Sequence, residues 1–148
     1  MNILCTNKKA SFKYSIIKKL EAGLNLQGWE VKSIKQGHAQ ISESYVSIKN
    51  NQAYLINAHL KVLDNTNNSD SVNPKRTRKL LLNKRELVYL KTEVSQNGHA
   101  LIPIKIYTKN SLIKLEIAIG KGKKTHDKRA AIKEREWQRN KDRILKKK

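Results

Sequence analysis

The sequence predicts a mainly β protein: a small closed barrel of six short antiparallel strands with flanking helices, followed by a basic tail. Two observations support the barrel: short segments alternate apolar and polar residues, as half-buried strands do, and glycine or asparagine separates these segments. Closing the sheet would also remove its exposed edges. The length supports the division of the chain, because 148 residues suit one domain, placed at 1–120, with a tail at 121–148.

The first two elements are expected to be a helix and a strand. Residues 11–22 carry apolar residues at helical spacing, begin at Ser11 and end before Gly23, which predicts a helix. From residue 24 to residue 35 the apolar residues alternate instead. This pattern predicts a strand, with Gly28 as a bulge.

The middle of the chain predicts three more strands, at 39–42, 45–50 and 53–63. The pair of asparagines at 50–51 suits a hairpin turn between two of them. Residues 64–75 are rich in Asn, Asp and Ser and poor in apolar residues. We expect them to form a mobile loop.

The last part of the body predicts a helix and two strands. Asn83 followed by Glu86 resembles a capping box, which marks the start of a helix. Alternating segments at 99–109 and 112–120 are predicted to be strands, joined by a turn at 110–111.

The charge of the chain points to a polyanionic partner. The formal net charge is +20, and residues 121–148 hold thirteen Lys or Arg against four Asp or Glu. This tail has too few apolar residues to fold alone, so we expect it to be disordered when free and helical on its partner. It lacks the broad apolar face of a membrane-binding helix, which favours nucleic acid over a membrane surface.

Other features indicate a cytoplasmic protein without a membrane span. Cys5 is the single cysteine, so no disulfide can form within the chain. The first residues contain no apolar run of signal-peptide length, and no 18 consecutive residues are apolar.

Catalytic chemistry is not indicated, and we expect neither an enzyme nor a metal or other cofactor. The four histidines are scattered, and no serine stands in a nucleophile-elbow motif. A nuclease needs clustered carboxylates to hold its metal ions, but no two acidic residues of the body lie within five positions of each other. A metal-dependent RNA-processing enzyme is kept as the alternative of a different class.

Two sets of charged residues in the body allow more than one interpretation. The run Lys75, Arg76, Arg78, Lys79, Lys84 and Arg85 is either the solvated rim of a core strand or a patch that contacts phosphates. Glu21 and Glu30 either form ordinary surface salt bridges, accept hydrogen bonds from bases, or order a neighbouring arginine.

Several segments resemble the SsrA-binding protein (SmpB) family of bacteria. They are NKKA at 7–10, EAGLNLQGWEVKSIKQG at 21–37, SESYVSI at 42–48, RTRKLLLNKREL at 76–87 and KGKKTHDKR at 121–129. The resemblance implies an oligonucleotide-binding-type (OB-fold-like) barrel and a role in trans-translation, for which a monomer suffices. Members bind the tRNA-like domain of transfer-messenger RNA (tmRNA, SsrA RNA), deliver it to stalled ribosomes, and replace the anticodon arm. The alternative function within the RNA-binding class is that of a general rRNA-binding or ribosome-assembly protein.

The resemblance also implies partners and site residues. The partners are tmRNA, the ribosome at its small-subunit decoding centre and mRNA channel, and elongation factor Tu with aminoacylated tmRNA. The tail would lie in the empty decoding site and channel. Residues matching the family's tmRNA-binding positions are Asn7, Glu21, Leu81 and Lys114, to which the basic run adds Arg76, Arg78 and Lys79. Ribosome binding by the tail is assigned to Lys123, Lys124, His126, Asp127, Lys128, Arg129 and Trp137.

Overall fold

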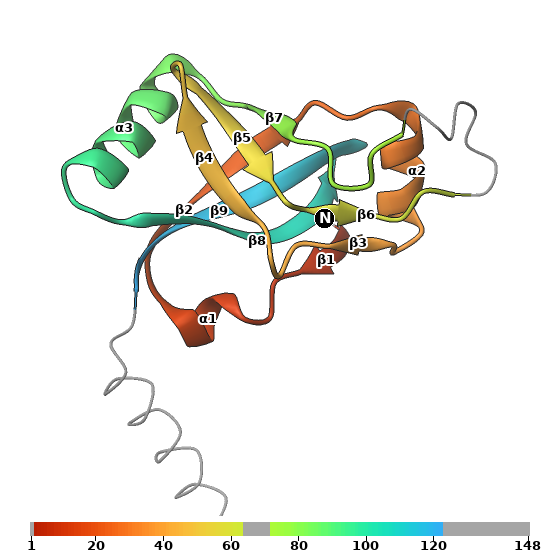
Figure 1. Ribbon diagram of the computed structural model, residues 1–148, viewed down its shortest axis with the longest axis horizontal. Helices are drawn as coiled ribbons and strands as arrows, with labels where there is room; N and C mark the ends of the chain where they lie inside the picture. The colour runs from red at the N-terminus through yellow and green to blue at the C-terminus, as the bar shows by residue number, and fades with distance from the viewer. Residues whose placement is uncertain (1, 64–71, 123–148) are drawn as a thin grey trace, which may run out of the picture.

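The computed structural model describes residues 2–63 and 72–122, and most of its strands form one curved antiparallel sheet (Figure 1). The strand order is β1 (Asn2–Thr6), β8 (Ala100–Lys109), β9 (Leu112–Gly122), β2 (Tyr14–Leu24), β7 (Arg78–Leu81), β5 (Gln52–Ile56) and β4 (Tyr45–Lys49). A second, two-stranded sheet pairs β3 (Ala39–Gln40) with β6 (His59–Leu60). The helices are α1 (Ala10–Lys13), α2 (Gly28–Lys35) and α3 (Lys84–Ser95).

The prediction of a closed six-stranded barrel is wrong, although the mainly antiparallel β class is confirmed. Within the described ranges the large sheet has seven strands, and its edge strands β1 and β4 do not pair with each other. Beside β1, the Cys5 thiol donates to the carbonyl of Ala39 in β3 at 3.2 Å, so the small sheet packs next to this edge strand. Alternation of apolar and polar residues indicates half-buried strands, but it does not determine whether the sheet closes.

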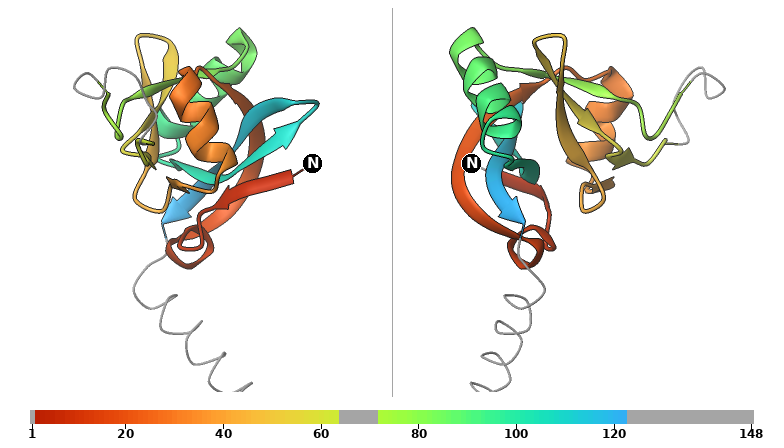
Figure 2. Two further views of the ribbon diagram at one scale, coloured as in Figure 1. Left: turned by 90° about the vertical axis from the view of Figure 1, so that its right-hand side faces the viewer. Right: turned by 60° about the vertical axis from the view of Figure 1, so that its left-hand side comes forward.

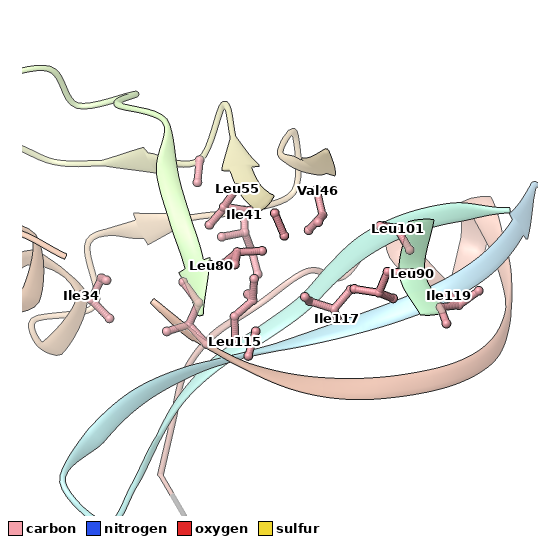
Figure 3. Close-up of a cluster of buried hydrophobic side chains, with 14 of the residues drawn as sticks. Ile34, Ile41, Val46, Leu55, Leu80, Leu90, Leu101, Leu115, Ile117 and Ile119 are labelled. Carbon is pink, nitrogen blue, oxygen red and sulfur yellow. The ribbon is translucent and has the colours of Figure 1, made fainter. Parts of the chain in front are cut away.

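The core lies between the two halves of the curved sheet (Figures 2 and 3). Leu115, Ile117 and Ile119 of β9 are fully buried, and they face Leu55 of β5 and Leu80 of β7 in one cluster. The residues that alternate with these three along β9 point to the other face of the sheet, as alternation along a strand requires. The same alternation therefore leaves a second, partly exposed face on β2, β7, β8 and β9.

The predicted helix at 11–22 is wrong, because the chain is helical only over α1 and continues as β2. The register of β2 against β9 shifts between Ile16 and Lys18. Such a bulge moves the alternation by one residue. Apolar residues at 16, 17 and 20 thus imitate helical spacing within a strand.

The predicted strand at 24–35 is also wrong, because residues 28–35 form α2. Its buried residues are Glu30, Ser33 and Ile34, at helical spacing, but two of the three are polar. An apolar pattern alone therefore does not reveal this face. The helix begins with a capping box in which Glu30 accepts from the backbone N–H of Gln27 at 2.7 Å.

Local signals in the rest of the chain are confirmed. Asn50 and Asn51 have φ of 53° and 59°, as a tight hairpin turn requires, and residues 110–111 make a similar turn between β8 and β9. The capping box of Asn83 and Glu86 begins α3. The prediction of a single strand at 53–63 is wrong: the chain forms β5 and β6 there, in different sheets, because it turns at Asn57, which has a φ of 65°.

Two other predictions concern segments that lie largely outside the described residues. Residues 64–71 of the predicted mobile loop and most of the predicted tail lie outside them. Strand β9 continues to Gly122, two residues past the predicted domain boundary. In the described part of the chain, no helix is long and apolar enough to cross a membrane.

Candidate nucleic-acid interface

Three of the four residues indicated by the family resemblance lie on the partly exposed face of the large sheet. Gly23 of β2 is opposite Leu81 on one side and Lys114 on the other. Cross-strand partners share a face, and so do residues two apart along one strand. Leu81, Lys114 and Glu21 therefore lie together.

The strand register adds two residues that the sequence alone did not indicate. Lys114 is opposite Tyr107 of β8, and Lys109 lies two residues further along that strand. We call Glu21, Leu81, Tyr107, Lys109 and Lys114 the platform. The alternation of 99–109 was the available signal for Tyr107 and Lys109, because it places them on one face of a strand.

Leu81 is the apolar centre of the platform and is 54% exposed. A Cβ atom on Gly23 would lie 3.1 Å from the Cβ of Leu81, so glycine lets the leucine pack directly over β2. Leu81 and Lys114 line a shallow hollow of about 290 Å³ beside Leu26 and Val31. The preceding residue, Leu80, points to the core and is 2% exposed, so alternation along β7 turns Leu81 to the exposed face.

Glu21 is held in place on the platform as an ionised acceptor. The Tyr107 hydroxyl donates to its carboxylate at 2.5 Å, and the Lys109 Nζ lies 3.5 Å away. The hydrogen bond from Tyr107 is the main cause that holds the pKa of Glu21 below its usual value. Burial and the neighbouring Glu21 raise the pKa of Tyr107, so the phenol keeps its proton. The carboxylate remains free to accept from further donors.

Asn7 lies apart from the platform. Its side chain is buried, donates to the carbonyl of Pro103 at 2.9 Å, and accepts from the backbone N–H of Lys9 at 3.2 Å. It lines a different hollow, of about 190 Å³, near Lys13 and Tyr45. Asn7 thus shapes the turn before α1, since its polar atoms already have partners.

The predicted phosphate contact of Arg78 is wrong. Arg78 is 1% exposed. Its Nε donates to Glu30 at 2.5 Å, and its two terminal nitrogens donate to the carbonyls of Ala58 at 2.6 Å and Pro74 at 3.1 Å. With its donors used inside the protein, Arg78 orders the chain and is not available to phosphate.

Glu30 is the centre of this buried cluster. Its side chain is 0% exposed, and Arg76 donates to it at 2.5 Å. Burial alone would raise the pKa of Glu30, but the hydrogen bonds from Arg76, the Gln27 backbone and Arg78 outweigh burial and lower it. Of the interpretations left open for Glu30, the one in which it orders neighbouring arginines is confirmed.

Arg76 and Lys79 remain partly accessible. The side chain of Arg76 is 32% exposed, although its Nε and one terminal nitrogen contact Glu30. Lys79 is half-buried opposite Tyr54 and borders a hollow beside Leu81. Lys79 thus extends the basic surface from the platform onto β7.

The predicted ribosome-binding residues of the tail all lie outside the described residues: Lys123, Lys124, His126, Asp127, Lys128, Arg129 and Trp137. Among the residues that are described, no three His, Cys, Asp or Glu side chains gather as metal ligands would.

A curved antiparallel sheet that carries lysines, an ordered carboxylate and an exposed leucine on one face belongs to the class of basic β proteins that bind polyanions. Residues 4–147 match the family model of the SmpB protein. The chain belongs to the SmpB protein family.

Individual relatives agree with this assignment. The SsrA-binding protein of Psychrobacter cryohalolentis is 48% identical over 146 residues, covering 99% of this chain and 92% of that protein. The SsrA-binding protein of Ruthia magnifica is 49% identical over 149 residues, covering 99% of this chain and 88% of that protein. A solved structure described as "tmRNA-SmpB: a journey to the center of the bacterial ribosome" has 33% identity and a TM-score of 0.69, covering 89% of this chain and 95% of that one.

Proposed function

We propose that this protein is the tmRNA-binding factor of trans-translation, a binding protein of the cytoplasm and not an enzyme. It holds the tRNA-like domain of tmRNA and brings it to stalled ribosomes, where it replaces the anticodon arm. Membership of the SmpB family supports this proposal, as do the SsrA-binding relatives and the tmRNA-SmpB structure. Elongation factor Tu with aminoacylated tmRNA is the further partner, and the chain acts as a monomer.

The platform is the observation that carries the proposal. Leu81 offers apolar surface to a sugar or base edge, while Lys109 and Lys114 suit phosphate oxygens. Glu21 accepts hydrogen bonds from base amino groups, since it is ionised and ordered. A folded RNA that presents a backbone beside exposed base edges satisfies all of these groups. The OB-like strand arrangement is proposed as the scaffold that displays them.

Residues 121–148 are proposed to enter the vacant decoding site and mRNA channel of the small subunit and to become helical there. Their charge suits a channel lined by RNA, and their few apolar residues make folding depend on the partner. Asp127, Lys128 and Arg129 would support accommodation, with Trp137 further along the tail. An empty channel would therefore be recognised through formation of the helix.

Two experiments test the proposal. RNA that copurifies with the protein from cells is sequenced, and tmRNA should dominate; a profile of ordinary tRNA or rRNA would refute it. A chain that ends at Gly122, so that β9 stays complete, should bind tmRNA normally but fail to support peptide tagging on stalled ribosomes. Tagging that survives this truncation would contradict the role of the tail.

A further inference from the structure

The large sheet has a short junction at the platform. β2 pairs with β7 at two positions, Gly23 with Leu81 and Leu24 with Leu80, whereas its register with β9 spans Tyr14 to Gly23. Figure 2 shows β7 joining the β4–β5 side of the sheet to the long strands. Leu81 stands at this junction, so its position relative to Lys114 depends on how β7 is held.

The other end of β7 is held by the buried Glu30 carboxylate. Arg76 lies just before the strand and Arg78 begins it, and both donate to Glu30 at 2.5 Å. Arg76 also donates to the carbonyl of Asn25 at 3.3 Å, directly after β2. Glu30 itself lies on α2, which follows β2 after a three-residue connection. The carboxylate therefore ties the corner between β2 and α2 to the start of β7.

The hydrogen bonds from Arg76 and Arg78 to Glu30 can fix the direction of β7 as well as its position. Charge-assisted hydrogen bonds from guanidinium groups constrain angles, whereas apolar contacts can slide. A buried ion pair contributes little net stability compared with apolar packing, but it can specify one arrangement. Leu81 is three residues beyond Arg78, roughly 10 Å along an extended strand. A tilt of β7 at the arginines would displace Leu81 across β2.

We propose that Glu30 is a positioning residue for RNA recognition: through Arg76 and Arg78 it sets where Leu81 stands on the platform. Glu30 does not touch the RNA, because its side chain is completely buried. This inference rests on the proposed function, since it concerns the same RNA-binding face.

Two glutamates with the same charge but different positions provide the main test. Glu30→Gln and Glu43→Gln each raise the net charge by one, and Glu43 makes an exposed pair with Lys9, also at 2.5 Å. Charge alone predicts that both variants bind RNA equally well or more tightly. Positioning predicts that Glu30→Gln weakens binding of the tRNA-like domain of tmRNA more than about threefold, which is the loss expected when a hot-spot contact is displaced. Glu43→Gln should not weaken this binding. Equal affinities of the two variants would overturn the inference.

Arg76→Ala is a milder second variant, in case Glu30→Gln does not fold. It keeps the bond between Glu30 and Arg78, and the folded state is checked by circular dichroism. Affinities of the wild type, Arg76→Ala, Leu81→Ala and the double variant form a cycle. If the cluster positions Leu81, the loss caused by Leu81→Ala shrinks to less than about twofold in the Arg76→Ala background. Independent losses that multiply would overturn the inference.

The salt dependence separates positioning from direct contact by Arg76. Loss of one phosphate contact lowers the slope of log affinity against log salt by about one, whereas loss of positioning leaves it unchanged. A reduced slope for Arg76→Ala would contradict the positioning role. Failure of the wild-type protein to bind the tRNA-like domain would refute the proposed function itself, and so differs from every outcome above.

Discussion

Replacing Leu81 by alanine tests whether the platform touches RNA. Leu81 is 54% exposed in the free protein. The substitution removes three carbon atoms, worth about 2.4 kcal/mol when they pass fully from water into an apolar contact. In the free protein Leu81 is somewhat less than half buried, where it packs over Gly23. The substitution should therefore lower the free energy of unfolding by the buried share of this value, roughly 1 kcal/mol.

The exposed part of the side chain remains for the RNA. If the complex buries it, the substitution costs about 1.3 kcal/mol of binding free energy, which is roughly a ninefold increase in Kd. Fluorescence anisotropy with the labelled tRNA-like domain of tmRNA measures this Kd at fixed salt, and urea unfolding measures the stability separately.

Val88→Ala is the matched control, because Val88 is 64% exposed on α3, away from the platform. Its Kd should equal that of the wild type. A Leu81→Ala protein that binds within about twofold of the wild type would refute contact at the platform, as would equal weakening by both variants.

Three further predictions concern the platform and the buried cluster. Gly23→Ala places a Cβ 3.1 Å from that of Leu81, so tmRNA affinity should fall; unchanged affinity would mean that the position of Leu81 is unimportant. Tyr107→Phe removes the hydrogen bond that lowers the pKa of Glu21, so NMR titration should find this pKa higher than in the wild type, and an unchanged value would disprove the cause assigned here. The pKa of Glu30 is lowered in the folded chain from its ordinary 4.5, so its contribution to stability is present above that value and lost as the pH falls below it. Urea unfolding should therefore show a steeper loss of stability in acid for the wild type than for Glu30→Gln, and parallel curves would contradict this.

The features that the sequence predicted correctly depend on neighbouring residues. The turn at Asn50 and Asn51 and the capping box of Asn83 and Glu86 are specified within four residues, so the sequence contains all the necessary information. The platform residues Glu21, Leu81 and Lys114 came from the family resemblance. Their common face could be recognised only with the register of the strands.

The errors came from features that depend on distant contacts. The bulge after Ile16 gave β2 an apolar spacing that resembles that of a helix. Helix α2 was not recognised, because its buried face is mostly polar. Arg78 resembled a surface phosphate ligand because its partner Glu30 lies 48 positions earlier in the chain. The pair of Tyr107 and Glu21 is separated by 86 positions. No local pattern reports such contacts, because they form only when the sheet is assembled.

Specific recognition of tmRNA by the platform can be tested directly with two RNAs of similar fold. The Kd of the full-length protein is measured for the tRNA-like domain of tmRNA and for an elongator tRNA, in the same buffer over a series of salt concentrations. We predict tighter binding of the tmRNA domain throughout, with both affinities decreasing as salt increases, because phosphate contacts release counterions in each complex. Equal affinities across the series would show attraction by charge alone and would contradict specific recognition by the platform.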